Sequence, residues 1–178
     1  MRIAAVTLLA GAALVLAGCV PSGPHATSPS PSATSIFASD EEALAAAEKA
    51  YAAYLQVSDQ ILADGGNNPE RLRPLVTQTV YSDELAGYKE FVQNGWHGVG
   101  QTTFYNFSLQ SYAGSDPNSI VSAYVCSDLS GTDVVDASGK SVVAANRPSK
   151  SPFEVQFALA RRALVVSSTN AWTGGGIC

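Results

Sequence analysis

The sequence has 178 residues, of which 46% are hydrophobic and 14% are charged, and its formal net charge is −5 at pH 7. This length favours one domain with a single sizeable core over two independent domains. The acidic balance argues against nucleic acid as a partner, because phosphate binding needs clustered lysines and arginines. Composition therefore indicates an ordinary compact domain and leaves its activity open.

The N-terminal segment has the pattern of an export signal. Arg2 precedes a mostly apolar run over residues 3–16, which is too short for a membrane-spanning helix. The run leads into Leu16-Ala17-Gly18-Cys19, which resembles the lipobox of bacterial lipoproteins. The resemblance implies cleavage after Gly18 and a diacylglycerol group on the Cys19 thiol, with fatty acids such as palmitate. Two acyl chains anchor a protein stably where one would bind reversibly. We therefore expect a lipoprotein at the extracytoplasmic face of the bacterial cell membrane; the alternative is an ordinary cleaved signal.

Residues 19–39 form the second segment of the expected organisation. Proline, serine, threonine and alanine dominate this stretch, and the near absence of groups to bury is typical of a flexible tether. His25 lies here, in surroundings that give no sign of a ligand site. We predict a lipoprotein signal peptide at 1–18, the lipidated cysteine and its tether at 19–39, and a single domain at 40–178.

Three helices are expected in the first half of this domain. Ser39 or Asp40 can cap the first helix, and the acidic residues that follow suit the positive end of its dipole. A short helical turn should begin at Pro69, and a third helix should run from Ser82 to Asn94. The first helix has a stripe at three- and four-residue spacing, formed by Leu44, Ala47, Tyr51, Tyr54, Leu55, Ser58, Ile61 and Leu62.

In the second half of the domain the apolar period changes to two, and β-branched and aromatic residues become more frequent. This pattern predicts strands at residues 102–112, 119–127, 153–159 and 163–168. A shorter hairpin should surround residues 137–140, where a glycine suits the turn. Helices followed by an antiparallel meander predict an α+β domain.

Several features of this layout resemble a known group of proteins. They are Tyr124-Val125-Cys126-Ser127-Asp128 in mid-sheet, the turn at 136–139, Arg147, and a terminal strand that reaches Cys178. Together they resemble lipoproteins of actinobacteria, the high-GC Gram-positive bacteria, whose domain is similar to the nuclear transport factor 2-like fold. The resemblance implies an α+β domain in which three N-terminal helices pack on a strongly bent antiparallel sheet, a cystatin-like cone. That fold serves enzymes and binding domains alike, so function must be argued from a site.

The cysteines of the predicted domain are Cys126 and Cys178. Outside the cytoplasm a disulfide between them is favoured, and it is the one pairing left if Cys19 is acylated. Metal ligation by the two thiols is the alternative, but no partner stands at zinc-like spacing. Three carboxylates could in principle bind calcium, although turn chemistry explains them equally well: Asp128, Asp133 and Asp136. We predict no metal and no cofactor.

His97 is the domain's single histidine and its weak candidate for a catalytic residue. In enzymes of the resembled fold, a histidine paired with an aspartate inside the cone can transfer protons. The alternative function is therefore an isomerase- or cyclase-like enzyme that uses His97 in a cone pocket. A general base needs an oriented partner, and the sequence places no carboxylate beside this histidine. We predict that the protein is not an enzyme.

Aromatic side chains provide the weak ligand-binding candidates. Most should fill the core, but any that lined an open cone would suit a small amphipathic ligand. The candidates are Tyr51, Tyr54, Trp96, Tyr105, Tyr124 and Trp172. The predicted function is a membrane-anchored, non-catalytic ligand-binding or protein-interaction module. Besides the membrane, the partners considered are a cell-wall polymer, a protein, and a second copy bound through the sheet. Arg161-Arg162 is most simply a solvated hairpin tip that could also meet a lipid head group or cell-wall polymer.

Overall fold

The computed structural model describes residues 36–113 and 121–178, and these belong to one compact unit, Ala33–Cys178. The predicted signal peptide, Cys19, His25 and most of the predicted tether lie outside the described residues. Within the two described ranges, no helix combines the length and the hydropathy needed to span a bilayer.

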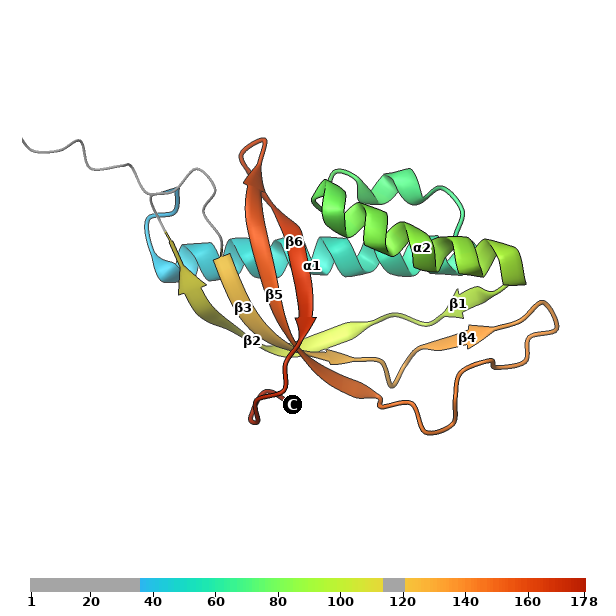
Figure 1. The fold of residues 1–178 in the computed structure, drawn as a ribbon. Helices are drawn as coiled ribbons and strands as arrows, with labels where there is room; N and C mark the ends of the chain where they lie inside the picture. The colour runs from blue at the N-terminus through green and yellow to red at the C-terminus, as the bar shows by residue number, and fades with distance from the viewer. Residues whose placement is uncertain (1–35, 114–120) are drawn as a thin grey trace, which may run out of the picture. The chain divides into compact units, whose positions relative to one another are not determined.

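Two α-helices and a short 3-10 helix come before most of the strands (Figure 1). They are α1 (Asp40–Ala63), η1 (Pro69–Leu72) and α2 (Gln78–Asn94). The Ser39 Oγ accepts a hydrogen bond from the Glu42 amide at 3.2 Å, so of the two caps considered for α1, Ser39 or Asp40, the structure uses Ser39. α2 begins at Gln78 rather than at Ser82, and it ends at Gly95, whose φ of 64° is left-handed.

The described residues form two antiparallel sheets. The strands are β1 (His97–Val99), β2 (Thr103–Tyr112), β3 (Val121–Asp128), β4 (Asp133–Val135), β5 (Lys150–Ala160) and β6 (Ala163–Ala171). The larger sheet has the order β2-β3-β5-β6, and the smaller sheet pairs β1 with β4. The predicted short hairpin is present after β4, where the Asp136 amide donates to the Lys140 carbonyl at 2.9 Å.

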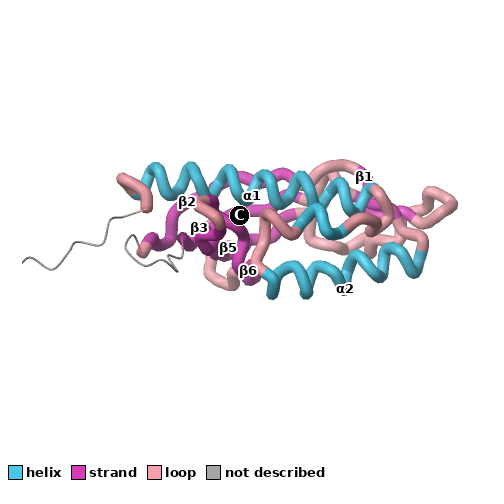
Figure 2. The backbone as a smooth tube through the Cα atoms, turned by 90° about the horizontal axis from the view of Figure 1, so that it is seen from above, coloured by secondary structure: helices cyan, strands magenta, loops and turns pink. Residues whose placement is uncertain are grey.

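The hydrophobic core lies between the four-stranded sheet and the helices. α1 packs on β2, β3 and β6, whereas α2 packs on β6 and α1 (Figure 2). Fully buried residues come mainly from the two interior strands and from α1: Ala43, Ala47, Ile61, Val121, Ala123, Val125, Val155 and Phe157. β3 contains Val121, Ala123 and Val125, which point to one face of the sheet, and Cys126, which points to the other. All four side chains are fully buried, so β3 is covered on both faces.

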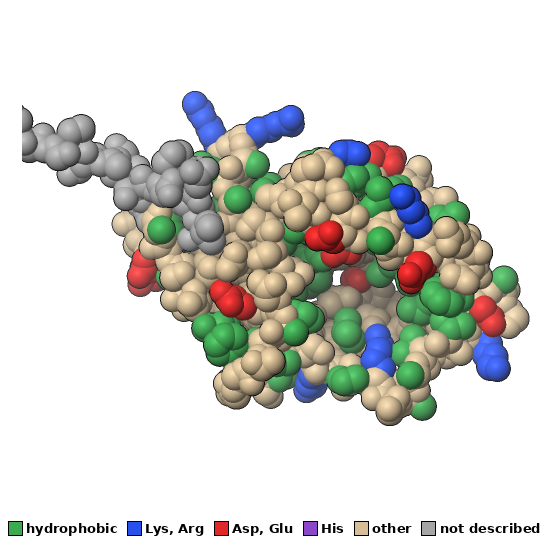
Figure 3. Space-filling model, viewed as in Figure 1, with side chains coloured by type: hydrophobic (Ala, Val, Ile, Leu, Met, Phe, Trp, Pro, Cys, Tyr) green, Lys and Arg blue, Asp and Glu red, His purple; other side chains and the backbone are tan. Residues whose placement is uncertain are grey.

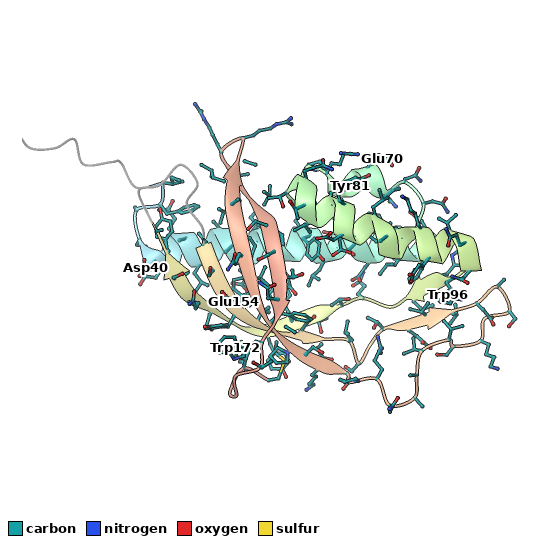
Figure 4. The ribbon with its side chains drawn as sticks, viewed as in Figure 1. Asp40, Glu70, Tyr81, Trp96, Glu154 and Trp172 are labelled. Atoms are coloured by element: carbon teal, nitrogen blue, oxygen red, sulfur yellow. A yellow bond between two sulfur atoms is a disulfide. The ribbon has the colours of Figure 1, made fainter. Side chains whose placement is uncertain are left out.

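A C-terminal tail, residues 172–178, provides the cover on the second face. Cys178 forms a disulfide with Cys126, and the Asn106 side-chain amide donates to the Ile177 carbonyl at 2.8 Å. The tail begins at Trp172, whose ring lies 4.6 Å from that of Tyr124 (Figure 4). A Cβ on Gly174 would lie 2.4 Å from the indole of Trp172, so only glycine fits there. The tail thus covers part of the sheet; the predicted self-association through this sheet stays a prediction.

The expected cone of three helices on a strongly bent sheet was wrong. The segment between α1 and α2 is a single four-residue 3-10 turn, because Pro69 and Pro74 bracket it and prevent a longer helix. The sheet is twisted but not strongly curled. Bulges bend a sheet, and here the β3–β5 pairing runs from Val121 to Asp128 without any register shift. The irregularities fall in the pairings of the edge strands β2 and β6.

Candidate functional site

A groove of about 490 Å³ runs along the exposed side of α1. One wall consists of α1 residues at helical spacing, and the other is the segment that connects β1 to β2. We call this site the α1 groove; its lining residues are Ala52, Leu55, Gln56, Asp59, Gln60, Ala63, Gly100, Gln101, Thr102, Thr103 and Phe104. From Ala52 to Ala63 the helix rises about 16 Å, since each residue adds 1.5 Å. The groove is therefore long enough for a short oligomer.

Asp59 joins the two walls of the α1 groove. Its carboxylate accepts a hydrogen bond from the Thr102 amide at 2.7 Å and another from the Thr102 hydroxyl at 2.9 Å. Both oxygens of Asp59 are therefore engaged with the opposite wall. Hydrogen bonds to a charged group are among the stronger ones, so this contact fixes the groove's width.

The segment that connects β1 to β2 packs closely against the β3–β4 loop. Gly100 has a φ of 85°, and a Cβ there would lie 1.9 Å from the Gly131 carbonyl oxygen, so the close approach requires glycine. Arg147 organises that loop by donating to the Thr132 carbonyl at 2.8 Å and to the Leu129 carbonyl at 3.2 Å. A second cavity, of about 110 Å³, opens beside this loop and shares Asp59 with the groove.

The face shown in Figure 3 is hollowed between α2 and the β1–β4 pair. Acidic, basic and hydrophobic side chains all appear around this hollow, whereas the core beneath the four-stranded sheet is hydrophobic. The half of the domain that contains β1 and β4 therefore has a concave surface.

The lining of the α1 groove is rich in neutral hydrogen-bonding groups. Gln56, Gln60 and Gln101 each offer a carbonyl acceptor and an amide donor, and Thr103 adds a hydroxyl. Leu55 and Phe104 add apolar surface. Among these lining residues, all of which are described, the carboxylate of Asp59 is the one charged group, and it is already paired.

Sequence analysis missed this site because its residues have the pattern of an ordinary solvated helix face. Gln56, Asp59 and Gln60 lie on the polar stripe of α1, and polar stripes are usual on surface helices. Thr102, the hydrogen-bond partner of Asp59, is 43 residues further along the chain, so no local signal links the two residues. The spacing of Gln56 and Gln60, one helical turn apart, is the trace that could have drawn attention to them.

The six aromatic candidates do not form one site, although Tyr51 contacts Tyr54 and Tyr124 contacts Trp172. Tyr51 and Tyr54 are 3% and 7% exposed and lie in the core of the domain. Trp96 packs edge-on against Phe91, with ring centroids 5.9 Å apart. Tyr105 lies under the Lys150 ammonium, and Tyr124 packs against Trp172 at the start of the tail. None of the six lines the α1 groove; Phe104, which was not a candidate, does so, and it also contacts Tyr51 at 5.1 Å.

His97 has a structural role at the end of α1. Its ring is exposed, and its Nδ1 lies 3.1 Å from the carbonyl oxygen of Ala63, so an Nδ1–H donates to the C-terminal turn of the helix. This bond ties β1 to α1. A general base must face a cavity and a carboxylate, and His97 instead faces solvent and a backbone carbonyl. His97 therefore lacks the placement that the isomerase- or cyclase-like alternative requires of it.

A partly buried polar cluster connects α1 with α2. The Tyr54 hydroxyl donates to Glu84 at 2.5 Å, and the hydroxyls of Ser58 and Tyr88 lie 2.9 Å apart. Burial raises the pKa of Tyr88 to about 12 and raises the pKa of Glu84 above its usual range. Burial likewise raises the pKa of Tyr51 to about 12. At neutral pH Tyr51 and Tyr88 are therefore neutral phenols, and Glu84 holds its proton more strongly than an exposed glutamate does. The hydrogen bonds of Tyr54 and Tyr88 join α1 to α2.

The three loop carboxylates serve turns. Asp136 accepts hydrogen bonds from Ser138 and Lys140, and these bonds lower its pKa. Asp128 accepts from the Ser130 amide, and its pKa is also lowered. Asp133 accepts from the Ser141 hydroxyl at 2.8 Å. Throughout residues 36–113 and 121–178, no group of three acidic, histidine or cysteine side chains is placed to hold a metal ion.

The fold and the groove define an antiparallel sheet domain with two packed helices and a polar groove on one of them. No protein-family model matches the sequence, and no curated protein matches it significantly. Among solved structures, the fold is similar to that of the intermembrane space region of chloroplast protein ARC6, with a TM-score of 0.53 and 11% identity over 74% of this chain and 97% of that one. A de novo β-sheet design solved by NMR has a TM-score of 0.33 and 12% identity over 76% and 92%. At these identities the likeness to the ARC6 region concerns the fold alone.

Proposed function

We propose that the protein is an actinobacterial lipoprotein, anchored at the extracytoplasmic face of the cell membrane by lipid on Cys19, and that its domain is a non-catalytic binding module. The lipobox at residues 16–19 supports the anchor. The α1 groove carries the binding role, because a concave site of a few hundred Å³ with several convergent polar groups is the usual form of a ligand site.

The ligand that suits the groove is a neutral glycan of the cell wall that bears hydroxyl and N-acetyl groups. Glutamine amides can donate to and accept from such groups without a formal charge on either side. Leu55 and Phe104 offer an apolar surface for the face of a sugar ring. Because the lining contains no lysine or arginine, the groove has no cationic side chain to pair with a phosphate or carboxylate ligand.

The binding role is tested with the trimer of N-acetylglucosamine, titrated into the mature chain and followed by NMR chemical shifts. We expect shifts confined to residues 52–63 and 100–104. Ala52→Trp fills the groove from an exposed helix position and should weaken binding about tenfold or more, which is about 1.4 kcal/mol. Ala86→Trp, at an exposed position of α2, is the matched control and should bind as the wild type does. Binding that Ala52→Trp leaves intact would contradict the groove as the site.

The glutamines are tested by a smaller change. Gln56→Ala combined with Gln60→Ala removes two amides from the groove and should weaken binding of the N-acetylglucosamine trimer by about 1–3 kcal/mol. Stability should change by less than about 0.5 kcal/mol, since both side chains are exposed. Gln93→Ala, an exposed glutamine on α2, should change neither quantity.

The anchor is tested separately by Cys19→Ser. We expect the wild type in the membrane fraction of its host and the variant in the soluble secreted fraction, because the acyl chains hold the chain at the bilayer. A Cys19→Ser protein that stayed in the membrane fraction would contradict the anchor and would leave the groove unaffected.

A further inference from the structure

The tip of the β5–β6 hairpin carries two side chains that neither the core nor the α1 groove uses. Ala160 pairs with Ala163, so Arg161 and Arg162 alone form the turn. Both are exposed, and Figure 3 shows basic side chains projecting from this tip. They are also the one pair of adjacent basic residues in the whole sequence.

The backbone of this turn is unfavourable for arginine. Arg161 has a φ of 50° and Arg162 a φ of 70°, the left-handed region at both positions. Two-residue hairpins with this geometry favour Asn-Gly, because a longer side chain crowds the backbone there. Strain that is kept at an exposed position indicates a role other than stability.

No contact within the described residues compensates for this strain. Neither guanidinium has an ion pair or a hydrogen bond in residues 36–113 and 121–178. Other arginines are engaged: Arg71 pairs with Asp64 at 2.6 Å, and Arg147 holds the β3–β4 loop. The tip therefore exposes two guanidinium groups that are free to bind a partner outside the protein.

We propose that the Arg161-Arg162 tip binds the phosphates of anionic lipid head groups and so docks the domain, tip first, on its own membrane. This inference rests on the lipid anchor of the proposed function. Guanidinium groups bind phosphate oxygens through paired hydrogen bonds. The chain is acidic as a whole, with a net charge of −5. An anionic membrane therefore repels most of the protein surface and attracts the basic tip.

The expected strength suits an anchored protein. One basic residue near an anionic membrane strengthens binding about fivefold, and two do so about 30-fold. Such a contact holds a free protein only at high lipid concentration, whereas an anchor raises the effective concentration of the tip at the membrane and makes the contact persistent. About 20 residues separate Cys19 from α1 and can extend to roughly 70 Å, so the connection is long enough for the tip to reach the head groups.

The test uses the full mature chain with Cys19→Ser, so that no acyl chain contributes, and vesicles of phosphatidylcholine with or without about one third phosphatidylglycerol. We expect sedimentation with the anionic vesicles only. Arg161→Asn combined with Arg162→Gly should reduce this partitioning about 30-fold and also raise the unfolding temperature, because Asn-Gly relieves the turn. Lys89→Ser combined with Lys140→Ser removes the same charge from two exposed sites elsewhere and should leave partitioning within about twofold of the parent.

Three results would overturn the inference: equal partitioning of the Asn-Gly variant and the parent, an equal loss in the lysine control, or tighter binding to soluble poly(glycerol phosphate) than to the vesicles. The last result would identify a phosphate polymer instead of the membrane. Because this assay contains no lipidated protein, its failure is distinct from a failure of the Cys19 anchor, which the fractionation experiment reports.

Discussion

The two halves of the domain are held together by different kinds of contact. Where β3 and β5 pair, the contacts are between apolar side chains, and Val125, Val155 and Phe157 have no exposed surface. Around the C-terminal half of α1, polar contacts add to the packing of the buried Ile61: Asp59 binds Thr102, and Arg147 binds backbone carbonyls. Stability is therefore concentrated under the sheet, whereas the polar lining of the α1 groove, apart from Asp59, can change without unfolding the domain.

The largest expected effect lies in the sheet half. Phe157→Ala leaves a cavity at a fully buried site and should lower the free energy of unfolding by about 3–5 kcal/mol, measured by urea denaturation. Its affinity for the N-acetylglucosamine trimer, measured where the variant is folded, should be unchanged. A loss below about 1 kcal/mol would show that stability is not concentrated there.

The disulfide should follow. Replacing Cys126 and Cys178 by serine opens a loop with a sequence separation of 52 and frees the tail, so unfolding free energy should fall by about 2–4 kcal/mol. Reduction of the wild type with dithiothreitol is the control and should give a similar loss. If neither treatment shifts the denaturation midpoint, the tail is not part of the stable sheet.

In the groove half, one residue should matter for stability. Asp59→Ala removes both hydrogen bonds to Thr102 and leaves that amide unpaired, which should cost about 1–3 kcal/mol. Asp64→Ala, which breaks only an exposed ion pair with Arg71, should cost less than about 1 kcal/mol. Equal losses in the two variants would contradict the role of Asp59 in joining the walls.

The smallest expected effect is a change in pH dependence. Because burial raises the pKa of Glu84, the folded state keeps this proton at pH values where the unfolded chain has lost it. The contribution of Glu84 to the free energy of unfolding is therefore fully present below the pKa of this carboxyl in the unfolded chain. It is lost as the pH rises through the higher pKa of the folded state. Glu84→Gln should remove that decline, so the variant gains stability relative to wild type between pH 4 and pH 7 in thermal denaturation, with Tyr54 still hydrogen-bonded. Glu90→Gln, exposed on the same helix, should run parallel to the wild type at every pH.

Local sequence signals located most elements of this fold. The cap at Ser39 and the stripe ending near Leu62 place α1, and the period of two places β2, β3, β5 and β6 within a few residues of their bounds. Pairing was harder, because β1 and β4 have three residues each and carry no periodicity. Sheet curvature could not be predicted either, since it depends on where the register shifts, and shifts leave no mark in composition.

The site was less accessible to sequence reasoning than the fold. The aromatic candidates were chosen for chemistry that a pocket could use, but large apolar groups are more often needed in the core, where Tyr51 and Tyr54 lie. His97 was a candidate because its side chain is titratable, and in the structure it instead hydrogen-bonds the Ala63 carbonyl at the C-terminus of α1. The groove forms only when Thr102 reaches Asp59 across the fold, a contact that no local pattern specifies.

The most direct test of the division between the two halves is hydrogen–deuterium exchange of the mature chain with and without a saturating concentration of the N-acetylglucosamine trimer. We predict slower exchange in residues 52–63 and 100–104, and no change in β3 or β5. Protection that appeared in the sheet or the C-terminal tail, with none along α1, would contradict the assignment of the α1 groove as the binding site.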